Sequence, residues 1–257
     1  MRTAPAGNCA RFAAKPLTHG GTPAPFWLAA FERDPLPPLD LAECPRLIVV
    51  APHPDDETLG MGATIARLVA SGVGVQVVVV SDGGAAEPAA TPSARLRLEA
   101  TRRHELRRAT NVLGIPPPIS LGMPDGELVD HEDRLTELLV EILGAGTGPR
   151  PWCATTWRGD GHPDHEAVGR AAAAACAHTD AALLEYPIWM WHWAHPDDAD
   201  VPWDRAYSIP TSARAIDRKR QAARSYRSQF EPSAGKPAIL SPFVLERLLA
   251  VGELVFR

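Results

Sequence analysis

The sequence predicts a three-layer α/β/α sandwich built on a mostly parallel sheet. Apolar runs of strand length alternate along the chain with longer segments of helical periodicity, and this alternation is typical of βαβ units. The run at 73–80 is rich in valine, as expected of a strand that helices cover on both faces. With 257 residues, the chain is long enough for one large domain with a well-buried core.

The predicted elements follow one another in a regular order. A first strand at 46–52 leads into a helix at 58–71, and the valine-rich strand ends in a flexible Ser-Asp-Gly-Gly turn. A long charged helix at 92–113 is closed by Gly114 and a run of three prolines. Further strands are expected near 119–121, 152–157 and 181–188, and further helices near 131–143, 164–178, 212–228 and 241–250, with an irregular segment at 189–211.

Residues 1–45 contain many prolines and show no sustained periodicity. We interpret them as an extended N-terminal arm, partly packed through 26–28 and Phe31, that precedes a single domain over 46–257. Its role stays open between covering the rim of a site and contacting another subunit.

The composition disfavours several classes of function. The formal charge of −5, without a Lys/Arg tract, argues against nucleic acid as a partner. No apolar run reaches the roughly 20 residues of a membrane-spanning helix, and the N-terminus lacks the apolar core of a secretory signal. Four cysteines without C-x-x-C spacing are typical of a reducing cytosol. We therefore expect a cytoplasmic protein, whose oligomeric state, homo-oligomer included, stays open.

Two clusters of histidine and aspartate indicate the chemistry. The segment from His53 to Glu57 follows the first strand, and Gly-His-Pro-Asp-His-Glu at 161–166 opens a later helix. Ligand sites of open α/β sheets lie at the carboxyl ends of the strands, so both clusters are expected at one edge. There His53 and Asp56 can converge with His165 on one ion. Two imidazoles and one carboxylate leave positions open on zinc, which is the pattern of a catalytic site.

Each cluster also has a plainer interpretation. A histidine beside acids at a helix start is often only an N-cap with a solvated neighbour. Two such clusters at equivalent junctions favour the metal site. The segment His-Pro-Asp-Asp at 195–198 repeats the first motif, but no helical pattern starts after it, so we interpret it as a loop.

The neighbours of the ligands supply the other groups that a hydrolase needs. Zinc held in this way activates water and polarises a carbonyl oxygen. Asp55 is placed to take a proton from the water. His162, three residues before His165, can stabilise an oxyanion or protonate a departing amine. Asp164 is the expected partner of His162, which it would hold cationic and oriented.

With both clusters in hand, the chain resembles the PIG-L/LmbE-like family of zinc-dependent de-N-acetylases over approximately residues 46–230. One motif is Ala-Pro-His-Pro-Asp-Asp-Glu at 51–57, with a proline inserted before the histidine, and the other is Gly-His-x-Asp-His at 161–165. The roles that this resemblance implies are zinc ligation by His53, Asp56 and His165, general base catalysis by Asp55, and a charged electrophilic or acid role for His162.

Weaker matches suggest contacts with a substrate. Arg102 in an Arg-x-x-Glu helix and Asp125 in Pro-Asp-Gly resemble family residues that contact the substrate and bind sugar hydroxyls. The plainer interpretations are a solvated ion pair and turn chemistry. Mycothiol-type members have a tyrosine just before the second motif, where this chain has Asp160. The oxyanion assistance and the substrate preference linked to that tyrosine are therefore not carried over.

Tryptophans gather after the last predicted strand. Trp189, Trp191 and Trp193 share one side if this segment is extended. The rings are either a wall that stacks on a sugar or a hydrophobic aglycone, with Trp191 as the candidate contact, or a cap on the core.

We therefore expect a Rossmann-like sandwich with a mononuclear zinc site that removes the N-acetyl group from an amino-sugar conjugate of the GlcNAc type. Another divalent first-row metal can take the place of zinc, because a His₂Asp set discriminates little among them. An amidase for a larger N-acyl group or a thiol-sugar conjugate would use the same apparatus. A nucleotide-binding module is disfavoured, since acids occupy the turn where a pyrophosphate would bind. A regulatory metal-binding protein would need neither Asp55 nor His162.

Overall fold

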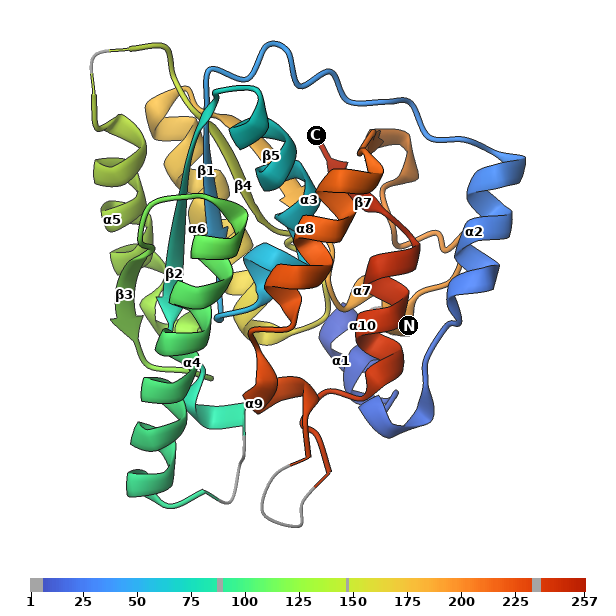
Figure 1. The fold of residues 1–257 in the computed structure, drawn as a ribbon, viewed down its shortest axis with the longest axis horizontal. Helices are drawn as coiled ribbons and strands as arrows, with labels where there is room; N and C mark the ends of the chain where they lie inside the picture. The colour runs from blue at the N-terminus through green and yellow to red at the C-terminus, as the bar shows by residue number, and fades with distance from the viewer. Residues whose placement is uncertain (1–6, 87–89, 147, 233–236) are drawn as a thin grey trace, which may run out of the picture.

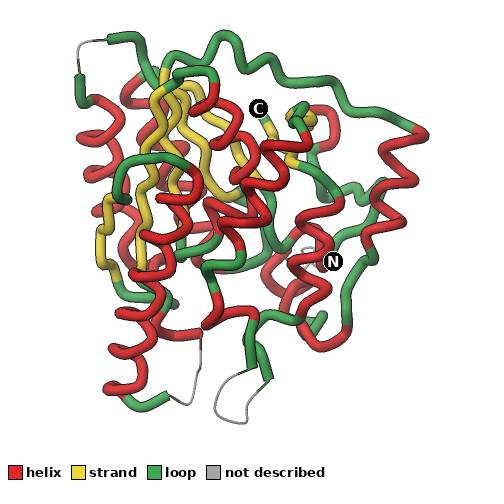
Figure 2. The backbone as a smooth tube through the Cα atoms, in the orientation of Figure 1, coloured by secondary structure: helices red, strands yellow, loops and turns green. Residues whose placement is uncertain are grey.

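One seven-stranded sheet forms the centre of the computed structural model, which describes residues 7–86, 90–146, 148–232 and 237–257 (Figures 1 and 2). The strand order is β3-β2-β1-β4-β5-β7-β6. The strands are β1 (Arg46–Ala51), β2 (Gly74–Ser81), β3 (Ile119–Met123), β4 (Trp152–Thr156), β5 (Ala182–Tyr186), β6 (Ala206–Ile209) and β7 (Glu253–Phe256). The first five strands are parallel to one another, and β7 runs antiparallel to both β5 and β6, between which it lies.

Helices cover both faces of the sheet, as Figure 2 shows. One layer contains α5 (Glu132–Gly144) and α6 (Pro163–Thr179), and the other contains α3 (Asp56–Ala70), α4 (Pro92–Leu113) and α8 (Ala213–Ala223). The remaining helices are α1 (Asn8–Ala13), α2 (Ala24–Arg33), α7 (Met190–Trp193), α9 (Arg227–Phe230) and α10 (Pro242–Ala250). The predicted α/β/α sandwich with a mostly parallel sheet is confirmed.

The central strand β1 shows why its sequence is apolar throughout. Val49 and Ala51 join the cluster on the α3 side, whereas Ile48 and Val50 join the one formed with α5 and α6. Because side chains alternate between the faces of a strand, a strand buried on both faces needs apolar residues at every position.

The strand order places a topological switch point between β1 and β4. From β1 the chain proceeds outward to β2 and β3, and then returns to add β4 and β5 on the other side of β1. The loops that follow β1 and β4 therefore diverge, and the crevice between them is where open α/β sheets bind ligands. These two loops carry the two His/Asp clusters.

The N-terminal segment departs from its prediction. Instead of an extended arm it contains two helices, α1 and α2, and a single 3-10 turn at Leu17–His19. The side chain of Trp27 on α2 is fully buried, and its ring meets that of Trp191 edge-on at 5.0 Å. Three of the prolines, Pro16, Pro23 and Pro25, lie at the starts of the 3-10 turn and of α2, where proline is tolerated. Strands β6 and β7 were also missed by the prediction.

Among the helices of the described residues, none combines the length and the apolar content that crossing a membrane requires. The positions of residues 1–6, part of the predicted arm, lie outside the described residues.

Candidate metal centre and active site

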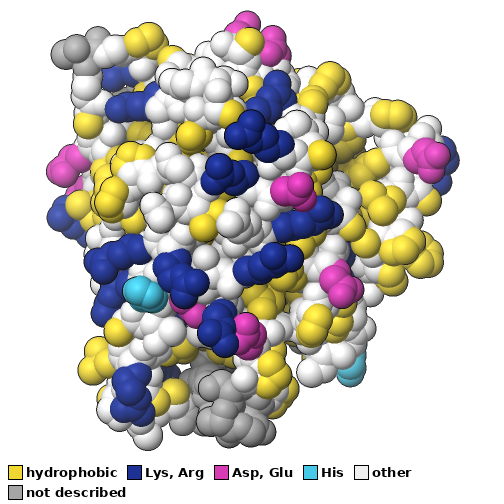
Figure 3. All heavy atoms as spheres, viewed as in Figure 1, with side chains coloured by type: hydrophobic (Ala, Val, Ile, Leu, Met, Phe, Trp, Pro, Cys, Tyr) yellow, Lys and Arg dark blue, Asp and Glu magenta, His cyan; other side chains and the backbone are white. Residues whose placement is uncertain are grey.

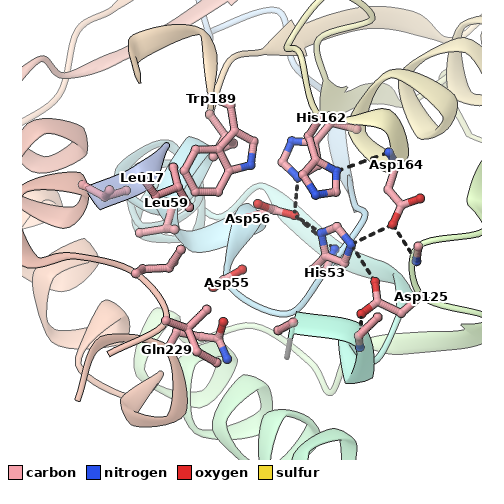
Figure 4. A pocket seen from close by; sticks show the side chains of 18 of the residues that line it. Leu17, His53, Asp55, Asp56, Leu59, Asp125, His162, Asp164, Trp189 and Gln229 are labelled. Carbon is pink, nitrogen blue, oxygen red and sulfur yellow. Dashed lines mark hydrogen bonds and ion pairs between the residues drawn. The ribbon is translucent and has the colours of Figure 1, made fainter. Parts of the chain in front are cut away.

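A pocket of about 280 Å³ opens at the switch point (Figure 4). Its charged and polar lining consists of His53, Asp55, Asp56, Arg102, Asp125, His162, Asp164, His165 and Gln229. These are all the site residues predicted from the sequence except Trp191, with Gln229 in addition. Segments more than a hundred residues apart in the chain therefore meet in one cavity.

The predicted ligand set is brought together around one carboxylate oxygen. Oδ2 of Asp56 lies 3.3 Å from Nδ1 of His53 and 3.3 Å from Nε2 of His165. One potential ligand atom from each of the three residues lies within 4.8 Å of the others, so the group could hold a metal ion. His53 follows β1, Asp56 begins α3, and His165 lies in the first turn of α6.

Asp160 orients the imidazole of His165, a function that the sequence reasoning missed. Its carboxylate lies 2.8 Å from Nδ1 of His165 and is fully buried. The same carboxylate accepts hydrogen bonds from the backbone N–H groups of Ile188, Trp189 and Met190. A carboxylate on one ring nitrogen fixes the tautomer and leaves the lone pair of the other free for an ion. Its place in the loop after β4, next to the second motif, was the available signal.

Carboxylates also hold the ring nitrogen of His53 that faces away from Asp56. Its Nε2 lies 2.9 Å from Oδ1 of Asp125 and 3.2 Å from Oδ2 of Asp164. His53, Asp125 and Asp164 form a second group close enough for an ion. This second group has one imidazole and two carboxylates, and both carboxylates also accept backbone N–H groups, from Ala85 for Asp125 and from Gly126 for Asp164. The Asp56 group has two imidazoles and one carboxylate, so it is the better candidate for an ion, and Asp125 and Asp164 hold Nε2 of His53.

The electrostatics of the ligand set match this assignment. Burial opposes the charge of Asp56, but His165 and His53 outweigh it and hold the pKa of the carboxyl well below its usual range. Burial likewise opposes a charge on His165, yet Asp56 and Asp160 raise its pKa to about 9. Without an ion, protons on the imidazoles compensate the buried carboxylates. Binding of a cation would displace these protons, because a ligating histidine must be neutral.

Asp55 lies beside the predicted ligand set, and its backbone has a conformation that residues other than glycine rarely adopt. Its φ is 129°, and its N–H donates to Oε2 of Glu57 at 3.0 Å. Nη2 of Arg102 donates to the carbonyl of Pro54 at 2.7 Å and lies 3.3 Å from Oδ1 of Asp55. Burial raises the pKa of Asp55 to about 8, although Arg102 opposes the shift. Strained backbone conformations that surrounding contacts hold in place are common at functional residues.

Glu57 anchors this strained turn from within the core, and sequence reasoning gave it no role. Its side chain is fully buried and accepts hydrogen bonds from the hydroxyls of Thr58 and Tyr226. Tyr226, which is also buried, comes from the turn before α9, close to the far end of the chain. The glutamate thus ties Asp55 to a distant segment, a link that adjacency in the sequence could not reveal.

The expected pairing of His162 with Asp164 is wrong in its detail. The backbone N–H of Asp164, not its carboxylate, approaches Nδ1 of His162 at 3.3 Å, so His162 caps α6. The carboxylate of Asp164 accepts from the backbone of Gly126 and Leu128 instead. Burial, with the charges of His165 and His53, lowers the pKa of His162 to about 3. The lowered pKa favours the neutral imidazole. Because Nδ1 accepts the backbone N–H of Asp164, the proton of the neutral ring lies on Nε2.

Arg102 does line the pocket, but it is buried and its guanidinium bonds to the backbone of Pro54 and Gly83 as well as to Asp55. The plainer interpretation, a solvated ion pair, is wrong for this residue. Arg102 therefore holds the side chain of Asp55 and the carbonyl of Pro54 that precedes it in place.

Trp191 does not contact the pocket, and its predicted role as a substrate contact is wrong. The segment turns into the short helix α7 rather than running extended, so Trp191, two residues from Trp189 and from Trp193, points away from both of them. Trp191 is 2% exposed, meets Phe31 edge-on at 6.1 Å and donates from Nε1 to the carbonyl of Pro187. Trp189 lines the pocket instead.

Replacing Trp191 with Ala should destabilise the protein by about 3–5 kcal/mol, because a buried indole leaves a cavity. The melting temperature is expected to fall by roughly 6–20 °C. A thermal melt by circular dichroism measures this effect. Phe26→Ala is the control, since Phe26 is 64% exposed and should change the stability by no more than about 0.5 kcal/mol. A Trp191→Ala variant that melts with the parent would show that the ring is not part of the core.

The repeated His-Pro-Asp-Asp motif forms no second site. His195 is exposed, and the carboxylate of Asp198 pairs with Arg11 of α1. The prediction that this segment is a loop is confirmed.

The fold and the site together define an α/β protein with a His₂Asp group that could hold a metal ion at its switch point. The chain belongs to the PIG-L family (GlcNAc-PI de-N-acetylase), which matches residues 48–176. It is 30% identical to a 1D-myo-inositol 2-acetamido-2-deoxy-alpha-D-glucopyranoside deacetylase of Mycobacterium sp. strain KMS, over 77% of this chain and 78% of that enzyme. The family resemblance predicted from the two motifs is confirmed.

Two further comparisons extend this picture. The chain is 30% identical to a diacetylchitobiose deacetylase of Thermococcus kodakarensis, over 48% of this chain and 46% of that protein. The structure of N,N'-diacetylchitobiose deacetylase from Pyrococcus horikoshii superposes with a TM-score of 0.58 at 22% identity, covering 77% of this chain and 76% of that one. This structural likeness supports the fold. Coverage of the curated relatives thus ranges from under half to over three quarters of their length.

Proposed function

We propose that this protein is a metal-dependent hydrolase that removes the acyl group from the nitrogen of an amino sugar, with N-acetylglucosamine as the sugar type. The observation that carries the proposal is the meeting of His53, Asp56 and His165 beside the strained Asp55 in one pocket. The deacetylase names of the relatives support the reaction class.

The donor set fits a divalent ion, and we propose zinc. Imidazole nitrogen and carboxylate oxygen are ligands that zinc prefers, and three protein ligands leave a position for a substrate or water. The ring nitrogens that face away from Asp56 are already held by Asp160 on one histidine and by Asp125 and Asp164 on the other. When bound, the ion supplies a Lewis acid that activates water and polarises the acyl carbonyl.

Asp55 is the proposed general base and the carrier of the proton to the leaving amine. A carboxyl whose pKa is raised towards the working pH can both accept and return a proton. His162, neutral with its proton on Nε2, is suited to donate a hydrogen bond to a developing oxyanion rather than to act as the acid. The opposite directions of these two pKa shifts support Asp55 rather than His162 as the carrier of the proton, a choice that the sequence left open.

Asp125 is the proposed contact for sugar hydroxyls. It lines the pocket on the far side of His53, and its Oδ2 accepts from the backbone of Ala85 at 2.6 Å while Oδ1 faces His53. A carboxylate held in this way has further acceptor capacity for a hydroxyl. Arg102 acts mainly through Asp55.

The test is metal analysis combined with amine release. Purified protein should contain about one divalent ion per chain and should release amine from N-acetylglucosamine, N,N'-diacetylchitobiose or the GlcNAc glycoside of inositol. A chelator should abolish the release, and readdition of the ion should restore it. Stoichiometric metal without amine release from any N-acylated sugar would contradict the proposal.

A further inference from the structure

The pocket beside the ligand set has an apolar half that the reaction so far leaves unused. It is lined by Phe12, Leu17, Leu59, Ile188, Trp189 and Val244. Hydrolysis of an acetyl group requires room for one methyl group only. Specific pockets are usually mostly apolar, with a few polar groups that fix the orientation of the ligand.

This apolar wall is made by parts of the chain outside the family match. The match covers 48–176 and contains the ligand set, Asp55 and His162. Of the six apolar residues, only Leu59 lies within it. Phe12 belongs to α1 and Leu17 to the 3-10 turn that follows, whereas Val244 belongs to α10 near the other end. The chemical groups and the apolar wall therefore come from different regions of the sequence.

Contacts with the rest of the chain hold the apolar wall in place. The ring of Phe12 packs against that of Trp189 at 5.1 Å and lies 6.1 Å from the ring of His162. Asn8 donates from its side chain to the carbonyl of Gly159 at 2.8 Å. The N-terminal helix α1 is thereby attached to the loop that carries the second motif.

The two halves of the pocket lie on opposite sides of Asp55 and Asp56. Figure 4 shows Trp189, Leu17 and Leu59 on one side, and His53, Asp125 and Asp164 on the other. An amide that is attacked here must place its carbonyl carbon near Asp55. Its nitrogen substituent and its acyl chain then point in different directions from that carbon. With the sugar at Asp125, the acyl chain points to the apolar side.

We propose that the apolar wall binds the acyl group, and that the substrate is an amino sugar whose N-acyl chain is longer than acetyl. This inference rests on the proposed hydrolase function and specifies its substrate class. The reaction consumes one water, breaks the C–N bond, and yields the free amino sugar and a short- to medium-chain carboxylate. The oxygen of the water joins the acyl carbon, and the proton that the water loses passes to the nitrogen of the departing amine.

The experiment uses glucosamine carrying N-acetyl, N-butanoyl or N-hexanoyl groups, with amine release as the readout. Each buried methylene contributes ~0.8 kcal/mol, about fourfold, so even partial burial should give N-hexanoyl at least about tenfold the kcat/KM of N-acetyl. Titration calorimetry with the Asp55→Asn variant, which should bind substrate and turn it over only slowly, should show the same order in Kd.

Two variants test the wall itself. Leu17→Asp places a carboxylate in the apolar half and Phe12→Ala removes a ring from it, so each should reduce the hexanoyl-to-acetyl ratio of kcat/KM by about tenfold. Leu28→Asp is the matched control. Leu28 is 44% exposed on α2 in the same N-terminal segment, and Figure 3 shows hydrophobic side chains on the surface over α2. The ratio compares two substrates on one protein, so partial loss of folded enzyme does not alter it.

The outcomes separate the two proposals. Absence of amine release from every substrate by metal-loaded protein contradicts the hydrolase function itself. Release from N-acetylglucosamine with no gain on lengthening the acyl chain overturns the acyl assignment alone. A gain for hexyl glycosides of N-acetylglucosamine, but not for longer acyl chains, overturns it in favour of an apolar aglycone. A ratio that Leu17→Asp and Phe12→Ala leave unchanged also overturns it.

Discussion

Replacing Asp55 with Asn is expected to lower kcat by a factor of about 10²–10⁴ while the bound metal stays in place. The carboxylate is the group best placed to accept a proton, and it is buried beside the ligand set without belonging to it. Asparagine keeps the shape of the side chain and tolerates positive φ better than most residues, which matters at a φ of 129°. Amine-release kinetics and elemental analysis measure the two effects.

The dependence on pH distinguishes loss of a base from a structural defect. Asp55 can accept a proton only when ionised, and burial raises its pKa to about 8 in the protein without an ion. A bound cation favours the ionised form, so the rate should rise with pH along a limb whose midpoint lies below about 8. That limb should be absent from the residual activity of Asp55→Asn. An unchanged limb, or unchanged turnover, would assign the base elsewhere.

Replacing His165 with Ala should abolish metal binding at micromolar ion and, with it, all hydrolysis. His165 supplies one of the three proposed ligands. Removing a residue that only hydrogen-bonds to a ligand typically lowers metal affinity about 10–100-fold, so removing the ligand itself should lower the affinity by more than that. Asp160→Asn tests that smaller effect, because the Asp160 carboxylate contacts Nδ1 of His165, the ring nitrogen that faces away from Asp56. Competition with a chromogenic chelator gives both affinities.

The chain offers a matched control for this experiment. His195 begins the same His-Pro-Asp-Asp sequence as His53 but lies exposed in a loop. His195→Ala should therefore bind metal and hydrolyse substrate as the parent does, whereas His53→Ala should resemble His165→Ala. Full metal occupancy in His53→Ala or His165→Ala would contradict the assigned ligand set.

The alternation of strands and helices could be predicted because each central strand is apolar on both faces, as β1 and β2 show. The convergence of His53 with His165 followed from the same reasoning, since parallel strands present their carboxyl ends at one edge. Strands β6 and β7 are only four residues long, and α1 and α2 are flanked by prolines. Such short elements carry too little periodicity to be recognised before the sheet and helices that stabilise them are known.

The supporting contacts of the site were harder to predict for a different reason. Asp160, Glu57 and Trp191 each have several plausible environments, and their partners lie far away along the chain or in the backbone. Asp160 bonds to residues 28 to 30 positions later, and Glu57 to Tyr226, 169 positions later. Trp191 lies on the side of α7 that faces away from the pocket, and there its ring packs edge-on against that of Trp27. This contact joins residues that are far apart in the sequence.

The carboxylate of Asp160 connects catalysis to specificity within a single group. It holds His165 with one set of contacts and the peptide N–H groups of Ile188 and Trp189 with another. The side chains at 188 and 189 are buried and line the pocket, while this carboxylate holds their backbones, so a substitution there would reshape the pocket wall without removing a hydrogen-bond donor. A proline at either place would withdraw a donor from that anion and disturb the ion from a distance. A change along this stretch must therefore keep the backbone donors as well as the packing of the pocket wall.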